Sequence, residues 1–281
     1  MDKSEAKSLF KNLLTRGLKE IFKRIVKSKS NDPDKKPDSP NPTLEKSHPW
    51  RICPIGQHWV TTHPLTVPAT ENQNSYTTIR DGHCANNPER QKGTSVQDYL
   101  SAKEMTLIAE TYFKDLSGPP ATGRLSEFKD ADKYDAFIRG WTKYWNEVLK
   151  PSQPLDPNLV KALIASESGF RPNITTQVGT TKNFAHGLMQ VTDETQKILM
   201  NVKGELRNHL IHIDRSELTD PNLNIGAGIR WLFHKKKLAE SKSGHDLSWA
   251  DGIQKYKAEK KGSKLINIVF NYYNQLKGDE K

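Results

Sequence analysis

One helix, predicted between Asp156 and Gly169, constrains the fold of this 281-residue chain more than any other segment. Asp156 suits the N-cap position, and Pro157 suits the first helical position, where no backbone N–H is needed. Gly169 and Pro172 are typical stop signals. The segment between these signals therefore predicts a helix of about three turns.

An acidic residue continues the apolar stripe of this helix. Val160, Leu163 and Ile164 recur at helical spacing, and Glu167 follows Val160 by seven residues. Burial disfavours the charged form of a carboxylate and raises its pKa, which suits a proton donor near neutral pH. A buried glutamate neutralised by a Lys or Arg partner fits the same pattern, so this helix alone does not decide between the two roles.

The composition is polar and basic. Hydrophobic residues make up 34% of the chain, charged residues make up 27%, and the formal net charge is +10. No run of 18 apolar residues is present that could span a membrane. The charge favours polyanionic partners such as nucleic acid, anionic lipid or acidic cell-wall polymers, and it does not choose among them.

The first 49 residues divide into two segments. Residues 1–29 are predicted to form a basic amphipathic helix, either a membrane-surface or delivery element or a helix that docks on protein. Residues 30–49 are rich in proline and read as a linker. Neither segment resembles a secretory signal peptide, because there is no continuous apolar region and no small-residue cleavage site.

Residues 50–92 are predicted to form a small β-rich module whose role the sequence does not state. Short strands are expected at Arg51–Val60 and Tyr76–Arg80, separated by turns rich in Pro and Asn. Two cysteines and three histidines of the module raise the hypothesis of a zinc site: Cys53, Cys84, His58, His63 and His83. Their spacing fits no familiar zinc pattern, so a Cys53–Cys84 disulfide or two free thiols is the better interpretation.

The rest of the chain is predicted to be helical. Residues 93–150 are expected to form a helical region that packs on a C-terminal helical domain over 151–281, with helical spacing over 95–116 and a core-facing aromatic stripe over 132–150. Beyond residue 130 we expect only helices joined by polar loops. Thr192 should cap one helix, and a helix over 222–239 should pack closely through Gly226 and Gly228. His234 to Lys237 is interpreted as a solvated charge run.

Three motifs follow one another in the second half of the chain. Glu167-Ser168 ends the first helix, Gly187-Leu188-Met189-Gln190 follows a polar loop, and Asn224 to Leu232 begins a later helix. Together, residues 155–275 resemble the soluble lytic transglycosylase (SLT) domain, a lysozyme-like family that acts on peptidoglycan. The resemblance covers somewhat under half of the chain. It implies a mainly α protein with a lysozyme-like helical catalytic domain over 151–281, preceded by the β-containing module and the basic N-terminal helix.

The family's fourth motif is a Tyr-Asn pair after a Trp-containing helix. Here Trp249 precedes Tyr256-Lys257, so the tyrosine is kept and a lysine replaces the asparagine. Tyr272 to Asn274 matches the pair superficially better, but a position in a terminal apolar helix suits core packing. We therefore predict Tyr256 as the motif tyrosine.

The resemblance also implies a reaction and its residues. Glu167 would protonate the leaving oxygen of the glycosidic bond and then remove a proton from the sugar 6-hydroxyl, leaving a 1,6-anhydro-muramic end. Ser168 would orient the acid or the acetamido group, and Tyr256 would hold the glutamate or stack near the sugar. Gly187, Leu188, Met189 and Gln190 would form the substrate-binding segment. No metal or organic cofactor is implied. A glutamate held neutral by burial alone, without a tight Lys or Arg pair, would suit this role.

Other functions fit part of the pattern. A hydrolytic muramidase would use Asp193 or Glu194 as its second carboxylate. A glycan-binding protein without activity is the second alternative, and nucleic acid is not an expected partner. The expected partner is the glycan strand of peptidoglycan, which lies outside the cytoplasm. We therefore expect an envelope or secreted location, reached without an ordinary signal peptide by a specialised secretion machine or a phage-like particle.

Overall fold

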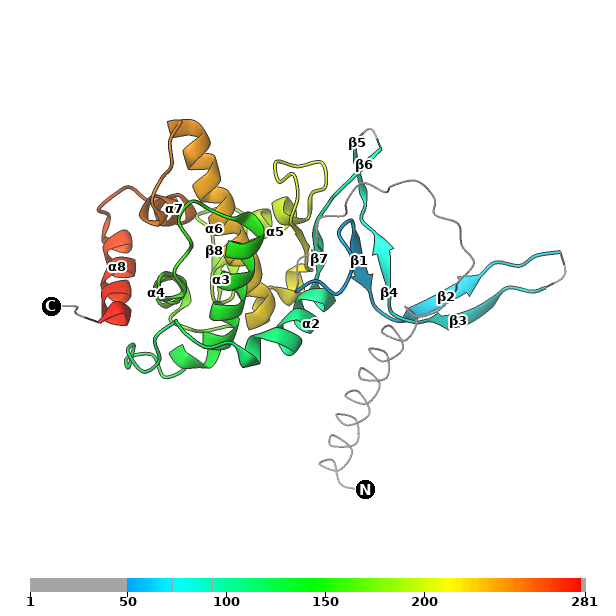
Figure 1. Cartoon of the computed structure of the whole chain (residues 1–281), viewed down its shortest axis with the longest axis horizontal. Coiled ribbons are helices and arrows are strands. Elements are labelled where there is room, and N and C mark those ends of the chain that lie inside the picture. The colour runs from blue at the N-terminus through cyan, green and yellow to red at the C-terminus, as the bar shows by residue number, and fades with distance from the viewer. Residues whose placement is uncertain (1–49, 72, 92, 279–281) are drawn as a thin grey trace, which may run out of the picture. The chain divides into compact units, whose positions relative to one another are not determined.

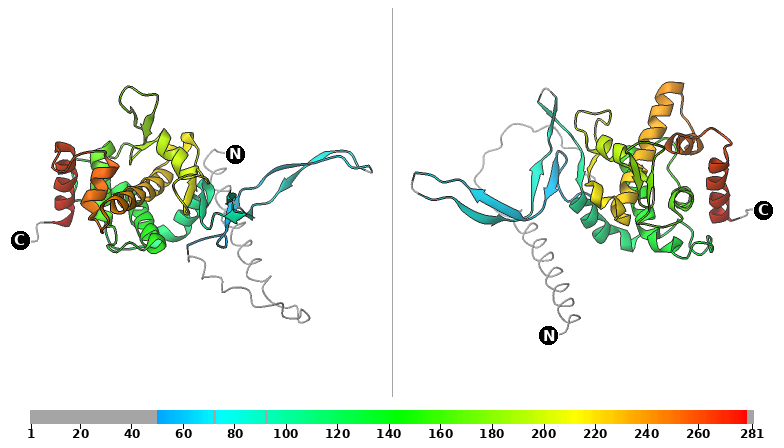
Figure 2. Two further views of the ribbon diagram at one scale, coloured as in Figure 1. Left: turned by 90° about the horizontal axis from the view of Figure 1, so that it is seen from above. Right: turned by 180° about the vertical axis from the view of Figure 1, so that it is seen from behind.

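The computed structural model describes residues 50–71, 73–91 and 93–278, which belong to one compact unit that spans 46–281 (Figures 1 and 2). The predicted N-terminal helix (1–29) and linker (30–49) lie outside the described residues. The described part is mainly α-helical with a smaller β-containing region before the helices, as predicted. None of its helices is long and apolar enough to cross a membrane. The α-helices are α2 (Ala102–Tyr112), α3 (Asp135–Leu149), α4 (Pro157–Ser168), α5 (Asp193–Met200), α6 (Pro221–Ser243), α7 (Trp249–Tyr256) and α8 (Lys264–Lys277).

The β-rich module consists of short antiparallel pairs. Its strands are β1 (Gln57–Val60), β2 (His63–Val67), β3 (Tyr76–Arg80), β4 (His83–Asn86), β5 (Glu89–Gln91) and β6 (Thr94–Ser95), paired as β1–β4, β2–β3 and β5–β6. The first strand is shorter than predicted, because residues 51–56 form bends and turns. The β2–β3 hairpin runs away from the helices and exposes Leu65, Tyr76 and Ile79 (Figures 1 and 2).

A disulfide joins Cys53 to Cys84. It ties the segment before β1 to β4, the strand with which β1 pairs. The alternative of two free thiols is therefore wrong. Within the described ranges, no group of three or more His, Cys, Asp or Glu residues is placed to hold a metal ion.

A buried cluster of charges fastens the module to the helices. The Arg51 side chain is 2% exposed, and its Nε lies 2.8 Å from Oε1 of the fully buried Glu104 on α2. Arg51 also pairs with Asp98, which lies 2.7 Å from Nδ1 of His209. Burial raises the pKa of Glu104, although the charge of Arg51 opposes this. Removing either partner would leave an uncompensated charge in the interior.

The helix predicted over 95–116 is shorter than its apolar spacing indicated. Val96 precedes β7 (Tyr99–Ser101), and the helix begins only at Ala102, where Oγ of Ser101 caps it by accepting from Glu104 N at 3.3 Å. Strand β7 pairs in parallel with β11 (Leu210–His212). Leu100 therefore lies in a strand that pairs with a distant part of the chain, although its spacing from neighbouring apolar residues also fits a helix.

The core is continuous from Trp50 to Leu276, and the aromatic stripe of α3 lies in it as predicted. Trp141 and Trp145 are fully buried, and Trp145 donates to the carbonyl of Gly226 on α6 at 2.9 Å. A Cβ on Gly226 would lie 2.4 Å from Met105 Cε, so the predicted close packing is confirmed. The predicted boundary between 93–150 and 151–281 stays a prediction.

The region after residue 130 is not purely helical, contrary to our expectation. A three-stranded antiparallel sheet, β8 (Thr175–Gln177), β9 (Phe184–His186) and β10 (Val191–Thr192), occupies part of the predicted polar loop. The signals for it are weak, because the strands are two or three residues long and β8 is exposed. Thr192 caps α5 as predicted, accepting from Thr195 N at 3.0 Å.

The charge run in α6 is only partly solvated, which corrects the predicted solvent-exposed face. His234 is 7% exposed and hydrogen-bonds Glu205 Oε1 at 2.9 Å, and Lys236 is 3% exposed and pairs with Glu240. Lys236 Nζ also lies 5.2 Å from the Trp249 ring centroid. His234 therefore connects α6 to the loop that contains Glu205, and Lys236 connects α6 to Trp249 of α7. Lys237 alone of the run is exposed.

Candidate active site

Helix α4 carries Glu167 in its last turn. Asp156 caps the helix by accepting from Asn158 N at 2.8 Å, and Pro157 occupies the first turn. Gly169 ends the helix with φ +57°, a conformation that favours glycine. Residues 159–165 are all buried, so α4 is a core helix. Its caps and its burial fix the place at which the Glu167 side chain emerges.

Glu167 is paired with Lys257, the residue that directly follows α7. Lys257 Nζ lies 2.8 Å from Glu167 Oε1, and the two side chains are 6% and 15% exposed. This corrects our expectation of an acid without a tight Lys or Arg pair. Burial raises the pKa of Glu167 above its ordinary value, although the charge and hydrogen bond of Lys257 lower it in part. The carboxyl group therefore keeps a raised pKa beside a buried ammonium.

Ser168 does not face the acid. It is 1% exposed, and its hydroxyl donates to the carbonyl of Ile164 at 3.2 Å, within its own helix. Ser166 contacts the site instead, because Lys257 Nζ donates to its Oγ at 3.2 Å. The orienting role expected for Ser168 stays a prediction, and in this conformation its hydroxyl is already engaged.

Asn224, on α6, clamps the segment from Gly187 to Gln190. Its Nδ2 donates to the carbonyls of His186 at 2.8 Å and Leu218 at 2.7 Å, and its Oδ1 accepts from Met189 N at 2.8 Å. Gly187 has φ +72°, and a Cβ there would lie 2.5 Å from Asn224 Nδ2. The turn therefore requires both the glycine and the asparagine.

Two of the predicted substrate-binding side chains are packed in the core. Leu188 and Met189 are both 0% exposed, and Met189 lies against Gly228 of α6. Gln190 is half-buried with φ +49°, and its Nε2 donates to the Gly187 carbonyl at 2.9 Å. Leu188 and Met189 thus fix the turn by packing in the core. Gln190 carries the only polar side chain of the 187–190 turn, and it is partly exposed.

Tyr256, at the end of α7, reaches the same turn. Its hydroxyl donates to the Met189 carbonyl at 2.6 Å. Burial raises the pKa of Tyr256 well above its ordinary value, and the negative charge of Glu167 adds to this. Tyr256 therefore lies close to the acid while its hydroxyl holds the 187–190 turn. The structure thus brings Glu167, Met189 and Tyr256 together from three separate segments.

The competing tyrosine motif lies on α8. Tyr272 packs against Phe128 with ring centroids 5.4 Å apart, and the Tyr273 hydroxyl donates to Asp156 Oδ2 at 2.8 Å, at the opposite end of α4 from Glu167. Asn274 is exposed. These contacts fit the packing role expected for Tyr272 and Tyr273.

The comparison with protein-family models agrees with this arrangement. The model described as "Transglycosylase SLT domain" matches residues 144–264, which contain α4, the 187–190 turn, α6 and α7. Residues 144–264 are an SLT domain. The comparisons with curated proteins and with solved structures gave no match. The match supports a role in the lytic transglycosylase family, with peptidoglycan as the substrate.

Asp193, the other carboxylate considered for catalysis, is engaged elsewhere in the SLT domain. Its Oδ1 lies 2.9 Å from His186 Nε2 and 2.8 Å from Arg215 Nε, and its Oδ2 accepts from Phe184 N at 3.0 Å. Burial raises the pKa of Asp193, but the hydrogen bonds and the Arg215 charge outweigh it and lower the pKa below its ordinary value. Asp193 is therefore an anchor for the β8–β10 sheet. Glu194 is exposed in the first turn of α5.

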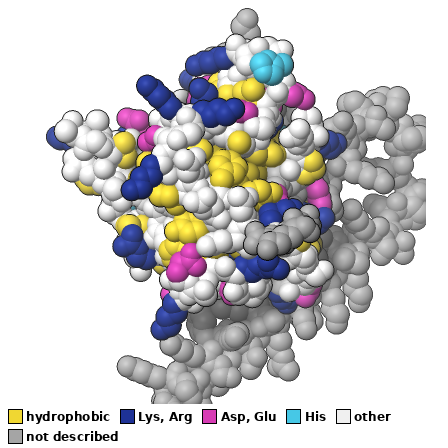
Figure 3. Space-filling view, turned by 90° about the vertical axis from the view of Figure 1, so that its left-hand side faces the viewer, with side chains coloured by type: hydrophobic (Ala, Val, Ile, Leu, Met, Phe, Trp, Pro, Cys, Tyr) yellow, Lys and Arg dark blue, Asp and Glu magenta, His cyan; other side chains and the backbone are white. Residues whose placement is uncertain are grey.

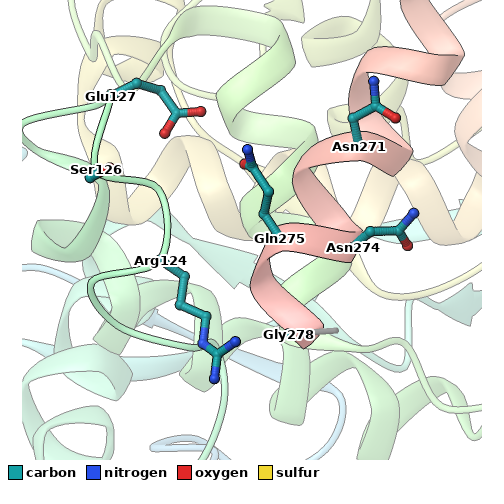
Figure 4. A pocket seen from close by; sticks show the side chains of 7 residues that line it. All are labelled: Arg124, Ser126, Glu127, Asn271, Asn274, Gln275 and Gly278. Carbon is teal, nitrogen blue, oxygen red and sulfur yellow. The ribbon is translucent and has the colours of Figure 1, made fainter. Parts of the chain in front are cut away.

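A shallow polar pocket lies apart from these residues (Figure 4). It lies between the 124–127 segment and α8, and none of the predicted site residues lines it. The side of the molecule on the left in Figure 1, where α8 lies, carries Lys and Arg side chains around a group of apolar ones (Figure 3). The segment between α7 and α8 exposes Lys260 and Lys261. Basic side chains on this face would attract an anionic polymer.

Sequence reasoning missed two features of the SLT domain site. The first is the contact of Lys257 with Glu167, which joins residues 90 positions apart. Its signal was the lysine itself, which stands where the family pattern has asparagine. The second is the clamp made by Asn224, whose signal was an asparagine at a fully buried position of an apolar helix.

Proposed function

We propose that this SLT domain is a peptidoglycan lytic transglycosylase with Glu167 as its acid and then its base. It would cleave the β-1,4 bond between N-acetylmuramic acid and N-acetylglucosamine without water and leave 1,6-anhydro-muramic ends. The main support is Glu167 itself, a carboxyl group with a raised pKa at the end of a core helix, next to Tyr256 and the 187–190 turn.

In the first step, protonated Glu167 gives its proton to the departing oxygen of N-acetylglucosamine. The carbonyl oxygen of the muramic acetamido group attacks C1 and takes the place of the bond that breaks. In the second step, the Glu167 carboxylate removes the proton of the 6-hydroxyl, whose oxygen attacks C1 and releases the acetamido group. Glu167 ends protonated, so the proton balance closes without water.

The surrounding residues would position the acid and the sugar. Tyr256 and Asn224 hold the 187–190 turn from both sides, through the carbonyl and the N–H of Met189. Gln190 would donate to or accept from the sugar, because its side chain is the polar one of the turn. No step requires a metal or an organic cofactor.

A hydrolytic muramidase is less well supported. Such an enzyme needs a second carboxylate near the bond that is cleaved. Asp193 is fixed by His186, Arg215 and Phe184 N, and Glu194 is exposed on α5. Within the described ranges, neither carboxylate forms a hydrogen bond or an ion pair with Glu167 or with the 187–190 turn.

The experiment that separates these reactions is mass spectrometry of fragments released from purified sacculi by the full chain. The proposal predicts muropeptides that end in 1,6-anhydro-muramic acid. Reducing muramic ends, which are heavier by one water, would show hydrolysis and would overturn the transglycosylase mechanism.

The ion pair between Lys257 and Glu167 favours one second candidate, a domain that binds glycan strands without cleaving them. A glutamate held permanently as a carboxylate cannot donate a proton. This candidate predicts that sacculi pull down the full chain and release no fragments over pH 4 to 8. Release of fragments anywhere in that interval contradicts it.

The location of the protein follows from the proposed substrate. Peptidoglycan lies outside the cytoplasm, so we propose that the protein acts in the cell envelope or is secreted. The basic segment 1–29 is the proposed contact with a membrane surface or a delivery machine. Fractionation of the native host tests this, and a strictly cytoplasmic protein would contradict it.

A further inference from the structure

We propose that Lys257 is a positioning residue for Glu167: it holds Oε1 of the acid, leaves Oε2 to the substrate, and sets the upper pH limit of the reaction. This inference rests on the proposed function for its kinetic test. It also has a test that does not need catalysis. It assigns a role to the one residue at which the chain departs from the Tyr-Asn pair that its SLT domain resembles.

The position of Lys257 is fixed at both ends. Its backbone N–H donates to the Ile253 carbonyl at 2.9 Å and thereby caps α7, directly after Tyr256. Its ammonium donates to Glu167 Oε1 at 2.8 Å and to Ser166 Oγ at 3.2 Å. With only 6% of the side chain exposed, the ammonium has little room to leave these acceptors.

The two oxygens of Glu167 differ in consequence. Oε1 accepts from Lys257, whereas Oε2 accepts no hydrogen bond from the residues that the structure describes. Oε2 is also absent from the set of buried polar atoms without a partner, so solvent reaches it. Lys257 therefore orients the carboxyl group with one oxygen inward and the other available to a glycosidic oxygen. This is the arrangement that a proton donor needs.

The charges that face Glu167 are few. Lys257 contributes the positive charge, and Tyr256 of α7 is a neutral phenol. Helix α8 packs on α4, but its Tyr273 bonds Asp156 at the far end of that helix. Asp193 forms an ion pair with Arg215 and a hydrogen bond with His186. Among the described residues, Lys257 is therefore the charge that decides how strongly Glu167 holds its proton.

The sign of the effect follows from this pairing. An ammonium at 2.8 Å stabilises the carboxylate and lowers the pKa of Glu167, whereas burial raises it. Activity requires the protonated acid, so activity is lost as the pH rises through the pKa of Glu167. Replacing Lys257 with a neutral residue removes the lowering effect. The upper pH limit should then move upward by about one to three pH units.

The kinetic test compares pH profiles of muropeptide release for the full chain and for Lys257→Met, Lys257→Asn and Lys257→Arg. The two neutral variants should move the upper limit of kcat/KM upward, and arginine should keep it close to that of the parent. A residue with a purely structural role would lower the rate by the same factor at every pH. An unchanged upper limit in both neutral variants, each shown to be folded by its circular dichroism, would overturn the proposal.

The second test measures the titration of the Glu167 carboxyl group directly by NMR. The full chain is labelled with ¹³C at glutamate side-chain carboxyl groups, and the Glu167 resonance is assigned by its loss in Glu167→Gln. Its titration midpoint should rise in Lys257→Met and return toward the parent value in Lys257→Arg. Equal midpoints in parent and Lys257→Met contradict the role of Lys257. Because no turnover is needed, this result stands even if the protein proves not to cleave peptidoglycan.

Discussion

The hydroxyl of Tyr256 donates a 2.6 Å hydrogen bond to the carbonyl of Met189, across 67 positions of sequence. This bond joins the end of α7 to the turn between β9 and β10. Lys257 follows Tyr256 directly, so the same anchor also brings the ammonium to Glu167. Two contacts made by neighbouring residues therefore link the 187–190 turn, the motif tyrosine and the acid.

Removing this bond should destabilise the turn. Tyr256→Phe leaves the buried carbonyl of Met189 without its donor, which should lower the free energy of unfolding by about 1–3 kcal/mol. Denaturant unfolding measures this change. Tyr272→Phe is the matched control, because the Tyr272 hydroxyl makes no hydrogen bond within the described part of the chain and the change should be small. Equal losses in the two variants would contradict an anchoring role for Tyr256.

The hydrogen bonds of Asn224 should contribute more to the free energy of unfolding than the Tyr256 hydrogen bond does. Asn224→Ala removes the partners of one N–H and two carbonyls, so the free energy of unfolding should fall by at least about 3 kcal/mol. Asn224→Asp should lose at least as much, because it keeps the acceptor for Met189 N but places a carboxylate oxygen against the carbonyls of His186 and Leu218 at a fully buried position. The exposed Asn271→Ala should stay within about 0.5 kcal/mol of the parent. A loss below about 1 kcal/mol in Asn224→Ala would show that the turn holds without its clamp.

The disulfide should stabilise the β-rich module. Cys53 and Cys84 are separated by 31 positions, and reducing such a bond typically costs about 2–4 kcal/mol. We expect dithiothreitol to lower the thermal midpoint of the parent chain. The double variant Cys53→Ser, Cys84→Ser should start at the lower midpoint and show no response to the reductant. A reductant effect of the same size in both proteins would assign the change to something other than this bond.

Local signals predicted α4 well, and long-range contacts explain what was missed. Asp156, Pro157 and Gly169 define the helix in the structure as they do in the sequence, because capping depends on neighbouring residues. The parallel pairing of β7 with β11 joins residues 111 positions apart and left no periodic trace. The apolar spacing at Val96 and Leu100 fitted a helix as well as it fitted the observed loop and strand.

The active site was also predicted only in part, because its local motifs are visible in the sequence and its long-range contacts are not. Glu167 and the 187–190 motif could be found from their residues, and the motif tyrosine followed from the resemblance. The partner of Glu167 could not be predicted, because Lys257 is 90 positions away in the sequence and only the folded structure brings the two side chains together. The sequence left two interpretations of Glu167 open, a buried acid with a raised pKa or a partner in an ion pair. In the structure its pKa is raised by burial and it also pairs with Lys257.

The central claim is that Glu167 supplies and then removes the proton in glycosidic cleavage. The most direct measurement compares the anhydro-muropeptides that the full chain and Glu167→Gln release from purified sacculi, with Glu194→Gln as the exposed control. We predict at least about a 100-fold loss for Glu167→Gln, with binding to sacculi retained and the Glu194→Gln rate unchanged. Release by Glu167→Gln within a few-fold of the parent rate would contradict this account.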